Sequence, residues 1–411
     1  MRTVSRLVVV SAVLLVSVGL EAQTQGDYPQ WRGPSRDGVI RSFTPPLVWP
    51  RQLTRKWRMA VGPGYATPLV VGSRLYVFAR EGASEVLSAH DAQTGRRIWA
   101  SPYPAPYAIA APGATRHGNG PKGTPAYADG RVFTLGISGI LTAFDAATGR
   151  QLWQKAAPAI EPKYGTATSP LVERGLVIVH VGGHDQGALT AFDAATGAVR
   201  WAWAGDGPGY ASPVIAEFGG VRQVVGLSQE HVAGVDLATG ALLWKQPFKN
   251  AFWTNIATPV IYRDTVVVSA NAVGTRAYRV TKGSAGWSAE PVWTNEDVQL
   301  NLSNPVLVGE ALIGMSAKNS GQFFSLDVRT GTTHWKSKGR EGDNASIAHA
   351  GGVLLMLKDS GELVVARPSA VGLDILGTYT VADSATYGQP ALTGNRVYVK
   401  DDAAVTLWTA P

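Results

Sequence analysis

The chain of 411 residues contains no cysteine, and this absence excludes several kinds of chemistry. Without thiols there can be no disulfide, no cysteine nucleophile, no Cys-x-x-Cys-His haem attachment and no lipidated N-terminal cysteine. A large exported domain can dispense with disulfides when its hydrophobic core is sufficient for stability. The sequence is therefore compatible with an exported protein that is held together by packing alone.

Charged residues are also scarce, at 16% of the chain, and the net charge of +7 is spread along the sequence without a basic run. Nucleic-acid binding requires a clustered basic surface, so we do not expect it. In contrast, the chain has 47 glycines and 13 tryptophans. Many glycines and aromatic residues with little charge are typical of all-β repeat proteins with numerous tight turns.

Long apolar runs are missing after the N-terminus. Residues 7–20 form a short apolar stretch behind Arg2 and Arg6. The stretch is shorter than the ~20 residues of a membrane-spanning helix and resembles the core of a secretion signal. We expect cleavage after Ala22, with cleavage after Gly19 or an uncleaved anchor as alternatives. The expected parts are a signal peptide at 1–22, an N-terminal arm at 23–50 and a repeat domain at 51–411, in a periplasmic or secreted protein without a membrane span in the mature chain.

One repeated unit fills the chain after residue 50. It contains Thr/Ser-Pro, three short apolar strands, Asp-x-x-Thr-Gly and then a tryptophan. The aspartate can accept hydrogen bonds from the turn that it opens, and the glycine four residues later can adopt a positive φ. Since five identical turns indicate a geometric role, we do not expect these carboxylates to be catalytic. They are Asp91, Asp145, Asp193, Asp236 and Asp327.

The tryptophan that ends each unit sets the period of the repeat. The series is Trp57, Trp99, Trp153, Trp201, Trp244, Trp293 and Trp335, with Tyr379 in the eighth place. A period of forty to fifty residues with about four strands per unit indicates propeller blades. We therefore predict an all-β fold, an eight-bladed β-propeller of four-stranded blades. The unit that ends at Trp293 has lost the Asp-x-x-Thr-Gly turn.

The two ends of the repeat region indicate how the ring closes. The last unit has strands near Pro390–Leu392, Arg396–Lys400 and Val405–Trp408, but no closing tryptophan strand. The first tryptophan lies in Leu53–Val61 and has no unit before it. We predict that this N-terminal strand pairs with Val405–Trp408 and completes the last blade, which would remove the free sheet edges.

The Asp-x-x-Thr-Gly-x-x-x-Trp repeat resembles that of the pyrroloquinoline quinone (PQQ) type propellers over roughly residues 50–411. Tyr28–Val39 (Y-P-Q-W-R-G-P-S-R-D-G-V) and Gly120–Gly136 are similar to segments of exported bacterial PQQ-like proteins. The resemblance implies one of two branches: quinoprotein dehydrogenases with PQQ and calcium, or non-catalytic proteins such as the BamB-type assembly factor. The chain lacks the vicinal disulfide typical of the first branch and the lipobox cysteine of the second.

The segments before the innermost strands are rich in aromatic and polar residues and should ring one mouth of the channel, where propeller ligands commonly bind. The alternative is that these residues only fill and hydrogen-bond the channel. His180, His184 and Asp185 form the only local group that resembles a metal site, and we expect a solvated surface there instead of a metal. The candidate ligand-binding residues are Tyr65, Arg116, His117, Asn119, Lys122, Tyr164, Tyr210, Trp253, Asn255, Asn304, Tyr387 and Gln389.

No catalytic constellation is found in the sequence, which offers no Ser-His-Asp arrangement, phosphate-binding loop or carboxylate pair. We therefore expect a non-enzymatic, monomeric propeller without a cofactor. Its partner would be a protein or peptide of the cell envelope, or a small ligand. A PQQ- or metal-dependent oxidoreductase and a module that binds sugars or polyphenols are the alternatives.

Overall fold

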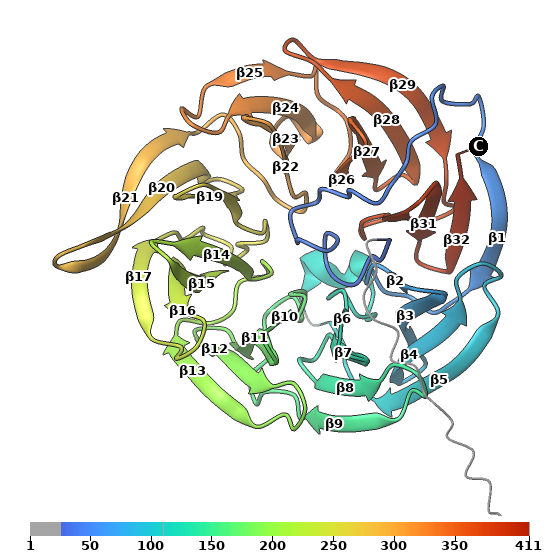
Figure 1. Cartoon of the computed structure of the whole chain (residues 1–411), viewed down its shortest axis with the longest axis horizontal. Helices are drawn as coiled ribbons and strands as arrows, with labels where there is room; N and C mark the ends of the chain where they lie inside the picture. The colour runs from blue at the N-terminus through green and yellow to red at the C-terminus, as the bar shows by residue number, and fades with distance from the viewer. Residues whose placement is uncertain (1–25, 110, 411) are drawn as a thin grey trace, which may run out of the picture.

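Eight four-stranded antiparallel sheets form a closed ring in the computed structural model, which describes residues 26–109 and 111–410 (Figure 1). The described residues contain only two short 3-10 helices, η1 (Pro112–His117) and η2 (Lys318–Ser320). The prediction of an all-β propeller with eight four-stranded blades is confirmed. The proposed signal peptide at 1–22 lies outside the described residues.

Within each blade the strands follow one another from the channel outward (Figure 1). Blades 1 to 4 consist of β2 (Leu69–Val71), β3 (Arg74–Glu81), β4 (Ser84–Asp91) and β5 (Arg97–Pro104); β6 (Ala126–Ala128), β7 (Arg131–Leu135), β8 (Leu141–Asp145) and β9 (Gln151–Lys155); β10 (Leu171–Glu173), β11 (Leu176–Gly183), β12 (Gln186–Asp193) and β13 (Val199–Gly205); and β14 (Val214–Phe218), β15 (Val221–Leu227), β16 (His231–Asp236) and β17 (Leu242–Pro247). Blades 5 to 8 consist of β18 (Val260–Tyr262), β19 (Thr265–Ala270), β20 (Gly274–Gly283) and β21 (Gly286–Asn295); β22 (Val306–Val308), β23 (Ala311–Ser316), β24 (Gln322–Asp327) and β25 (Thr333–Lys336); β26 (Ala345–Ala350), β27 (Val353–Lys358), β28 (Glu362–Pro368) and β29 (Leu373–Thr380); and β30 (Ala391–Thr393), β31 (Arg396–Lys400), β32 (Ala404–Thr409) and β1 (Thr54–Ala60).

The Asp-x-x-Thr-Gly segments form turns between the third and the outermost strands, as predicted. In the first turn, the Asp91 carboxylate accepts hydrogen bonds from the backbone N–H of Thr94 and from its hydroxyl, both at 2.8 Å. Gly95 closes this turn with a φ of +74°. Because the side chain of the aspartate satisfies the backbone donors of the turn, the tight reversal of the chain is stable even at the exposed edge of a blade.

The tryptophan of one blade packs on the turn of the next. Trp57 Nε1 donates a hydrogen bond to the carbonyl of Gln93 (2.8 Å), and a Cβ on Gly95 would lie 3.1 Å from the Trp57 indole. A Cβ on Gly149 would come within 2.5 Å of Trp99. The turn glycine therefore meets two requirements at once, a positive φ and the absence of a side chain beneath the indole. The same contact joins Trp153 to Gly197, Trp201 to Gly240 and Trp293 to Gly331.

Blade 5 departs from this scheme because its unit lacks the Asp-x-x-Thr-Gly turn. Strands β20 and β21 instead form a long hairpin that projects from the ring (Figure 1). Trp244 Nε1 donates within its own blade to Gln223 Oε1 (2.7 Å). Gln246 Nε2 provides a link to this hairpin by donating to the carbonyl of Ala289 (2.6 Å).

A second link joins neighbouring blades close to the channel, at the Thr/Ser-Pro marker. The backbone N–H of Thr67 donates to the hydroxyl of Thr124 in the next blade (3.1 Å). The N–H of Thr124 donates in turn to Ser169 (2.9 Å), and that of Ser169 to Ser212 (2.9 Å). The hydroxyl of the marker thus accepts a backbone donor from the preceding blade, which explains why Ser or Thr precedes the proline.

The N-terminal strand of the domain lies in the last blade. Strand β1 pairs antiparallel with β32, with Met59 opposite Val405 and Ala60 opposite Ala404. The predicted pairing of Leu53–Val61 with Val405–Trp408 is therefore confirmed. Lys400, which is 2% exposed, donates from Nζ to three backbone carbonyl oxygens beside this junction. These oxygens belong to Gly62 (3.2 Å), Gly64 (2.5 Å) and Asp401 (3.1 Å).

The N-terminal arm is packed against the propeller from Gly26 onward and runs from the centre of the ring out to β1 (Figure 1). Tyr28 exchanges two backbone hydrogen bonds with Val70 of β2, at 2.7 and 3.0 Å. Ile40 N–H donates to the carbonyl of His349 in β26 (2.8 Å). Tyr28 and Ile40 are fully buried. We call residues 28–40 the plug, because they fill one end of the channel.

Two buried arginines anchor the plug among backbone carbonyls. Burial lowers the pKa of Arg32 to about 10 and that of Arg36 to about 9, so both guanidinium groups remain protonated at neutral pH. Neither forms an ion pair with an acidic side chain of the described residues. Arg36 also donates to the side-chain oxygen of Gln30 (3.2 Å). The backbone acceptors are the carbonyl oxygens of Ser169, Pro170 and Pro213 for Arg36, and those of Asp37 and Pro305 for Arg32.

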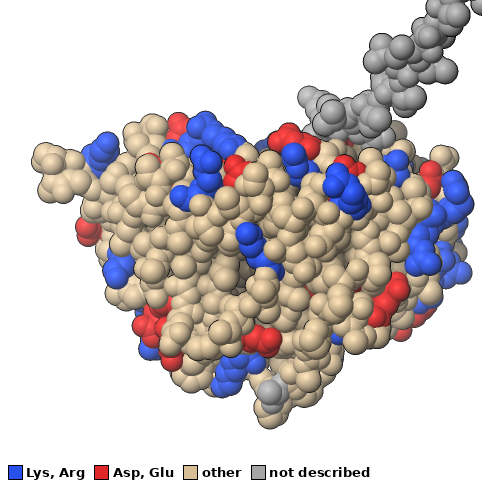
Figure 2. Space-filling view, turned by 90° about the horizontal axis from the view of Figure 1, so that it is seen from below, with Lys and Arg blue, Asp and Glu red and all other residues tan. Residues whose placement is uncertain are grey.

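Charged side chains gather near the two faces of the ring, where the turns lie. Figure 2 views the ring edge-on and shows basic and acidic residues interspersed near both faces, with further basic residues on the outer wall between them. In the part of the chain that the structure describes, no helix reaches the length and hydrophobicity needed to cross a bilayer.

The Trp-on-Gly contact can be tested with a matched pair of glycines. Gly149 (φ +77°) lies under Trp99, whereas Gly175 (φ +75°) has open space where a Cβ would be. Replacement by alanine imposes nearly the same backbone strain at both sites, but only Gly149→Ala also overpacks a ring. We expect Gly149→Ala to lose ~1–3 kcal/mol more of the free energy of unfolding than Gly175→Ala in urea. Equal losses would show that φ alone selects the glycine.

Three truncated chains separate the contributions of the plug and of β1. The chain that begins at Gly26 retains both the plug and β1. The chain that begins at Arg51 retains only β1, and the chain that begins at Val61 retains neither. We expect the melting temperature to fall at each step, because each deletion exposes buried apolar residues and unpaired backbone. If the chains that begin at Arg51 and Val61 melt together, β1 does not stabilise the ring.

Candidate functional site

A cup of about 370 Å³ lies at the mouth of the channel opposite the plug. Loops before the innermost strands and turns between second and third strands both reach this face, because neighbouring strands are antiparallel. Trp31 of the plug also lines the cup. Its Nε1 donates to Thr258 Oγ1 (3.3 Å), at the level of the Thr/Ser-Pro markers. Trp31 therefore closes the inner end of the cup, which makes the mouth a pocket with a floor.

Seven of the predicted mouth residues line the cup. Two groups of rings form part of its wall. The Tyr65 and Tyr387 rings lie 4.7 Å apart between centroids, and His117 meets Tyr387 edge-on at the same distance. Tyr164 and Tyr210 form the second group, at 5.8 Å. The seven residues are Tyr65, Arg116, His117, Lys122, Tyr164, Tyr210 and Tyr387.

Local structure positions His117 and Lys122. Helix η1 begins at Pro112, whose fixed φ suits a first helical turn, and is followed by Gly118 with a φ of +62°. This short helix carries His117 over the cup. Lys122 follows four residues after Gly118, and its Nζ donates to the carbonyl of Tyr164 (3.0 Å) from the neighbouring blade.

In the described part of the chain, the residues that line the cup include basic groups but no carboxylate. Burial lowers the pKa of Lys122 to about 8, so the ammonium group is mostly charged at neutral pH. Burial, together with the positive charges of Lys122 and Arg116, lowers the pKa of His117 to about 4, so this imidazole is neutral. Arg116 forms an ion pair with Asp343 (2.9 Å) at the exposed rim. None of the described residues that line the cup is acidic. Lys122 therefore contributes a positive charge that no lining carboxylate balances.

Four predicted mouth residues do not line the cup and instead hold the scaffold. Asn255 is fully buried, and its Nδ2 donates to the backbone carbonyls of Ser228 and Phe248. Gln389 Nε2 donates to the carbonyl of Ile347 (2.7 Å). The contacts of Asn255 and Gln389 thus match the alternative expectation, in which such residues only form hydrogen bonds within the channel. The remaining two are Asn119, whose Oδ1 accepts from Ile109 N–H, and Asn304, whose Oδ1 accepts from Thr258 N–H.

Trp253 lies outside the cup, beside other rim residues. Its ring is contacted by Lys163 Nζ at 4.9 Å from the centroid and by the ring of His184 at 4.4 Å. The neighbouring Phe252 lines the cup and is 55% exposed. The aromatic pair was visible in the sequence, but the positive φ of Trp253 (+57°) turns the chain there, and only Phe252 lies at the cup.

The expectation of a solvated surface at His180 is wrong. This side chain is 9% exposed and its Nε2 donates to the carbonyl of Asp206 (3.1 Å). Burial lowers the pKa of His180 to about 4. The strand β11 extends to Gly183, so His180 lies inside the sheet instead of in the loop. Among residues 26–109 and 111–410, no three His, Cys, Asp or Glu side chains come together as metal ligands would.

Several lining residues were not predicted. Trp31 belongs to the arm motif, and nothing in the sequence indicates that this motif enters the channel. Asn271 lies in the turn between β19 and β20, which is a turn between second and third strands and not a segment before an innermost strand. Five further lining residues lie in segments that were predicted to ring the mouth: Phe252, Thr254, Ile256, Asn301 and Leu302. The polar and large apolar lining residues outside those segments are Trp31, Asn271 and Asn344.

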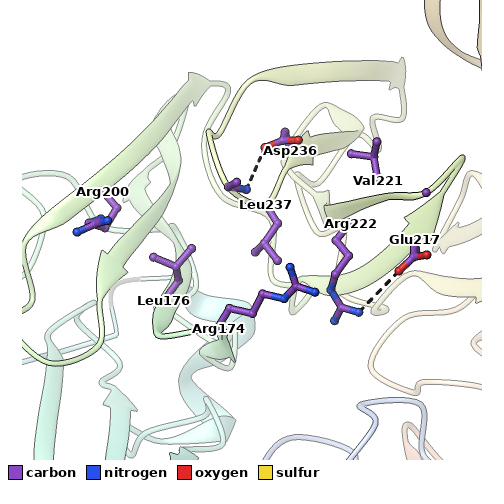
Figure 3. A pocket seen from close by; sticks show the side chains of 10 residues that line it. Arg174, Leu176, Arg200, Glu217, Val221, Arg222, Asp236 and Leu237 are labelled. Carbon is purple, nitrogen blue, oxygen red and sulfur yellow. Dashed lines mark hydrogen bonds and ion pairs between the residues drawn. The ribbon is translucent and has the colours of Figure 1, made fainter.

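A second hollow, of about 600 Å³, lies between blades 3 and 4 (Figure 3). Arg174 and Arg200 line it, but its central cation, Arg222, already has acidic partners. Arg222 contacts Glu173 at 2.6 Å and Glu217 at 4.0 Å. Because these guanidinium–carboxylate pairs neutralise each other, this hollow is a weaker candidate than the cup for holding a charged ligand.

The repeat, the eight blades and the Trp-on-Gly contacts define a propeller of the PQQ-like class with a pocket at one mouth. A family model described as outer membrane protein assembly factor BamB matches residues 82–337. This match covers more than half of the chain, which therefore belongs to this family. A search of curated proteins found no match.

Solved structures share the fold at low sequence identity. BamB from Moraxella catarrhalis is 18% identical, with 87% of this chain and 97% of that chain covered and a TM-score of 0.63. Quinohemoprotein alcohol dehydrogenase ADHIIG from Pseudomonas putida HK5 is 15% identical, with 94% and 80% covered and a TM-score of 0.59. A europium-containing methanol dehydrogenase is 14% identical, with 92% and 91% covered and a TM-score of 0.55. These similarities show a common fold.

The lining of the cup does not fit a calcium-held quinone. Calcium takes six to eight oxygen ligands, usually with several carboxylates. The described lining offers the amide oxygens of Asn271, Asn301 and Asn344 but no carboxylate. The lining also holds the cationic group of Lys122, which would repel a metal ion. We therefore derive no chemistry through PQQ and calcium.

The low pKa of Lys122 gives a pH-dependent prediction. Only the neutral amine acylates, so trace acetylation of Lys122 should become half-maximal near pH 8, about two units below an ordinary lysine. Lys400 is the control: burial also lowers its pKa to about 8, but its near-complete burial should keep it unmodified. Mass spectrometry of peptides after labelling at several pH values measures both. A Lys122 profile that still rises near pH 10 would contradict the described environment.

Proposed function

We propose that the protein is a non-enzymatic binding propeller and that the cup at the channel mouth is its binding site. The observation that carries the proposal is a floored aromatic pocket in which the half-buried ammonium group of Lys122 faces no carboxylate among the described lining residues. A buried charge is costly unless a partner compensates it, so the site favours an anionic group from a ligand. The cup volume lies within the ~300–1,000 Å³ range of small-molecule pockets.

The hydrogen bonds in the cup support binding over catalysis. His117 is the usual candidate for a general base at neutral pH, but its Nε2 already accepts a hydrogen bond from Arg116 Nε (3.3 Å). The ammonium group of Lys122 already donates a hydrogen bond to the carbonyl oxygen of Tyr164. The lining side chains thus hold one another in place, as a preorganised binding site requires.

The proposal includes a location and a type of partner. The apolar stretch at residues 7–20 supports export to the periplasm or the medium. The family is named for a factor of outer membrane protein assembly, which supports a role in the cell envelope. The ligand would then be a small molecule of this compartment or a side chain of an envelope protein, bound by a monomeric propeller.

An oxidoreductase is the second candidate, because two of the similar structures are alcohol and methanol dehydrogenases. Addition of PQQ and Ca²⁺ to the purified protein tests it. One bound quinone per chain with dye-linked alcohol oxidation would replace the binding proposal, whereas no uptake and no turnover would support it.

Substitutions in the cup and at the rim locate the binding site. Small acids from a compound library that raise the melting temperature of the wild type should lose their effect in Lys122→Met and in His117→Ala. Trp253→Ala, outside the cup, should retain it. Trp153→Ala should lower the melting temperature without ligand, because Trp153 joins two blades. If the rim variant alone abolishes the thermal shift, the cup is not the site.

A further inference from the structure

The polar groups of the cup indicate a narrower class of ligand than anions in general. Three asparagine amides, of Asn271, Asn301 and Asn344, line it together with Lys122. Asn344 Oδ1 accepts a hydrogen bond from Ser303 Oγ (3.1 Å), which fixes its amide. The side chains of Asn271 and Asn301 make no hydrogen bond within the described chain. The cup therefore presents amides that have donor and acceptor capacity to spare.

An amide group both donates and accepts hydrogen bonds. Neighbouring hydroxyl groups on a ligand do the same, so amides match a polyhydroxylated ring better than they match a bare aromatic acid. An ammonium group has only donors and matches a carboxylate. These two kinds of group lie in the same pocket, so the ligand should carry hydroxyls and a carboxylate together.

The aromatic residues add a requirement for flat apolar faces. Trp31 closes the inner end, and the rings of Tyr65 and Tyr387 lie 4.7 Å apart on the wall. Large rings supply contact area at low cost in side-chain entropy while their polar tips still form hydrogen bonds. A pyranose has one apolar C–H face and a rim of hydroxyls, and it fits a pocket that combines rings with amides.

We propose that the cup binds an acidic saccharide, in which a sugar ring carries a carboxylate recognised by Lys122. The inference rests on the proposed function, because it assigns a ligand class to the same site. Within the described chain, the buried guanidinium group of Arg36 donates hydrogen bonds only to carbonyl and amide oxygens, whereas the charge of Arg32 is partly offset by the Asp37 carboxylate. The plug therefore adds a net positive potential along the channel axis, which favours an anionic sugar. The carboxylate of Asp343 at the rim is already paired with Arg116.

The test compares wild-type binding of two disaccharides, one containing glucuronate and the other its neutral glucose counterpart, by isothermal titration calorimetry. We expect the acidic sugar to bind at least tenfold more tightly, with a preference that weakens as salt is added. Lys122→Met should abolish the preference while Lys122→Arg retains it, and Lys56→Met, on the exposed side of β1, should have no effect. Asn271→Leu and Asn301→Leu should weaken both sugars, since both present hydroxyls.

The possible outcomes separate this inference from the proposed function. Equal affinity for the two sugars would overturn the assignment of an acidic saccharide. Binding of benzoate but of neither sugar, lost in Lys122→Met, would also overturn it and leave the cup as the binding site. If neither sugar nor benzoate binds, and cup variants do not change the thermal shift given by any library compound, both the saccharide assignment and the proposed function fail. The comparison in the wild type does not depend on any variant being folded.

Discussion

The ring depends on the contacts between neighbouring blades, and at five of the junctions the tryptophan of one blade packs on the turn glycine of the next. The aspartate shapes the turn, the glycine supplies a positive φ and leaves room for an indole, and the indole N–H reaches a carbonyl of the same turn, as Trp57 does at Gln93. Hydroxyls such as that of Thr124 add a second link near the channel. Blades joined in these ways form a closed ring, which brings loops distant in sequence to one mouth.

The plug converts an open channel into a pocket. Arg32 and Arg36 donate hydrogen bonds to backbone carbonyl groups around the channel, and Trp31 lines the cup at the opposite mouth. The arm is thus part of the candidate site as well as of the fold. The plug places two buried cations, Arg32 and Arg36, at the centre of the ring. The cup adds a third positive charge, that of Lys122, which no carboxylate of the described lining balances. The chemistry of the cup follows from this accumulation of positive charge at the axis of the ring.

The blades could be predicted because their determinants are local and repeated. Each Asp-x-x-Thr-Gly turn lies within five residues, and the unmatched Leu53–Val61 strand revealed the closure. The site was harder to predict than the blades. The polarity of a residue does not indicate whether its side chain bonds to a ligand or to another part of the protein. Asn255 and Lys122 have similar sequence surroundings, yet Asn255 bonds to backbone carbonyls while Lys122 lines the cup. Trp31 could not be assigned because its position depends on contacts between the arm and distant blades.

The most direct measurement of the central claim follows the indole N–H resonance of Trp31 while a glucuronate-containing disaccharide is added. Trp31→Phe assigns this resonance among those of the other tryptophans. A floor position predicts a saturable shift of the Trp31 signal, with Trp153, which lies between two blades, unchanged. A Trp31 signal that stays in place while the signal of Trp253 at the rim moves would contradict the account, because the ligand would then bind outside the cup.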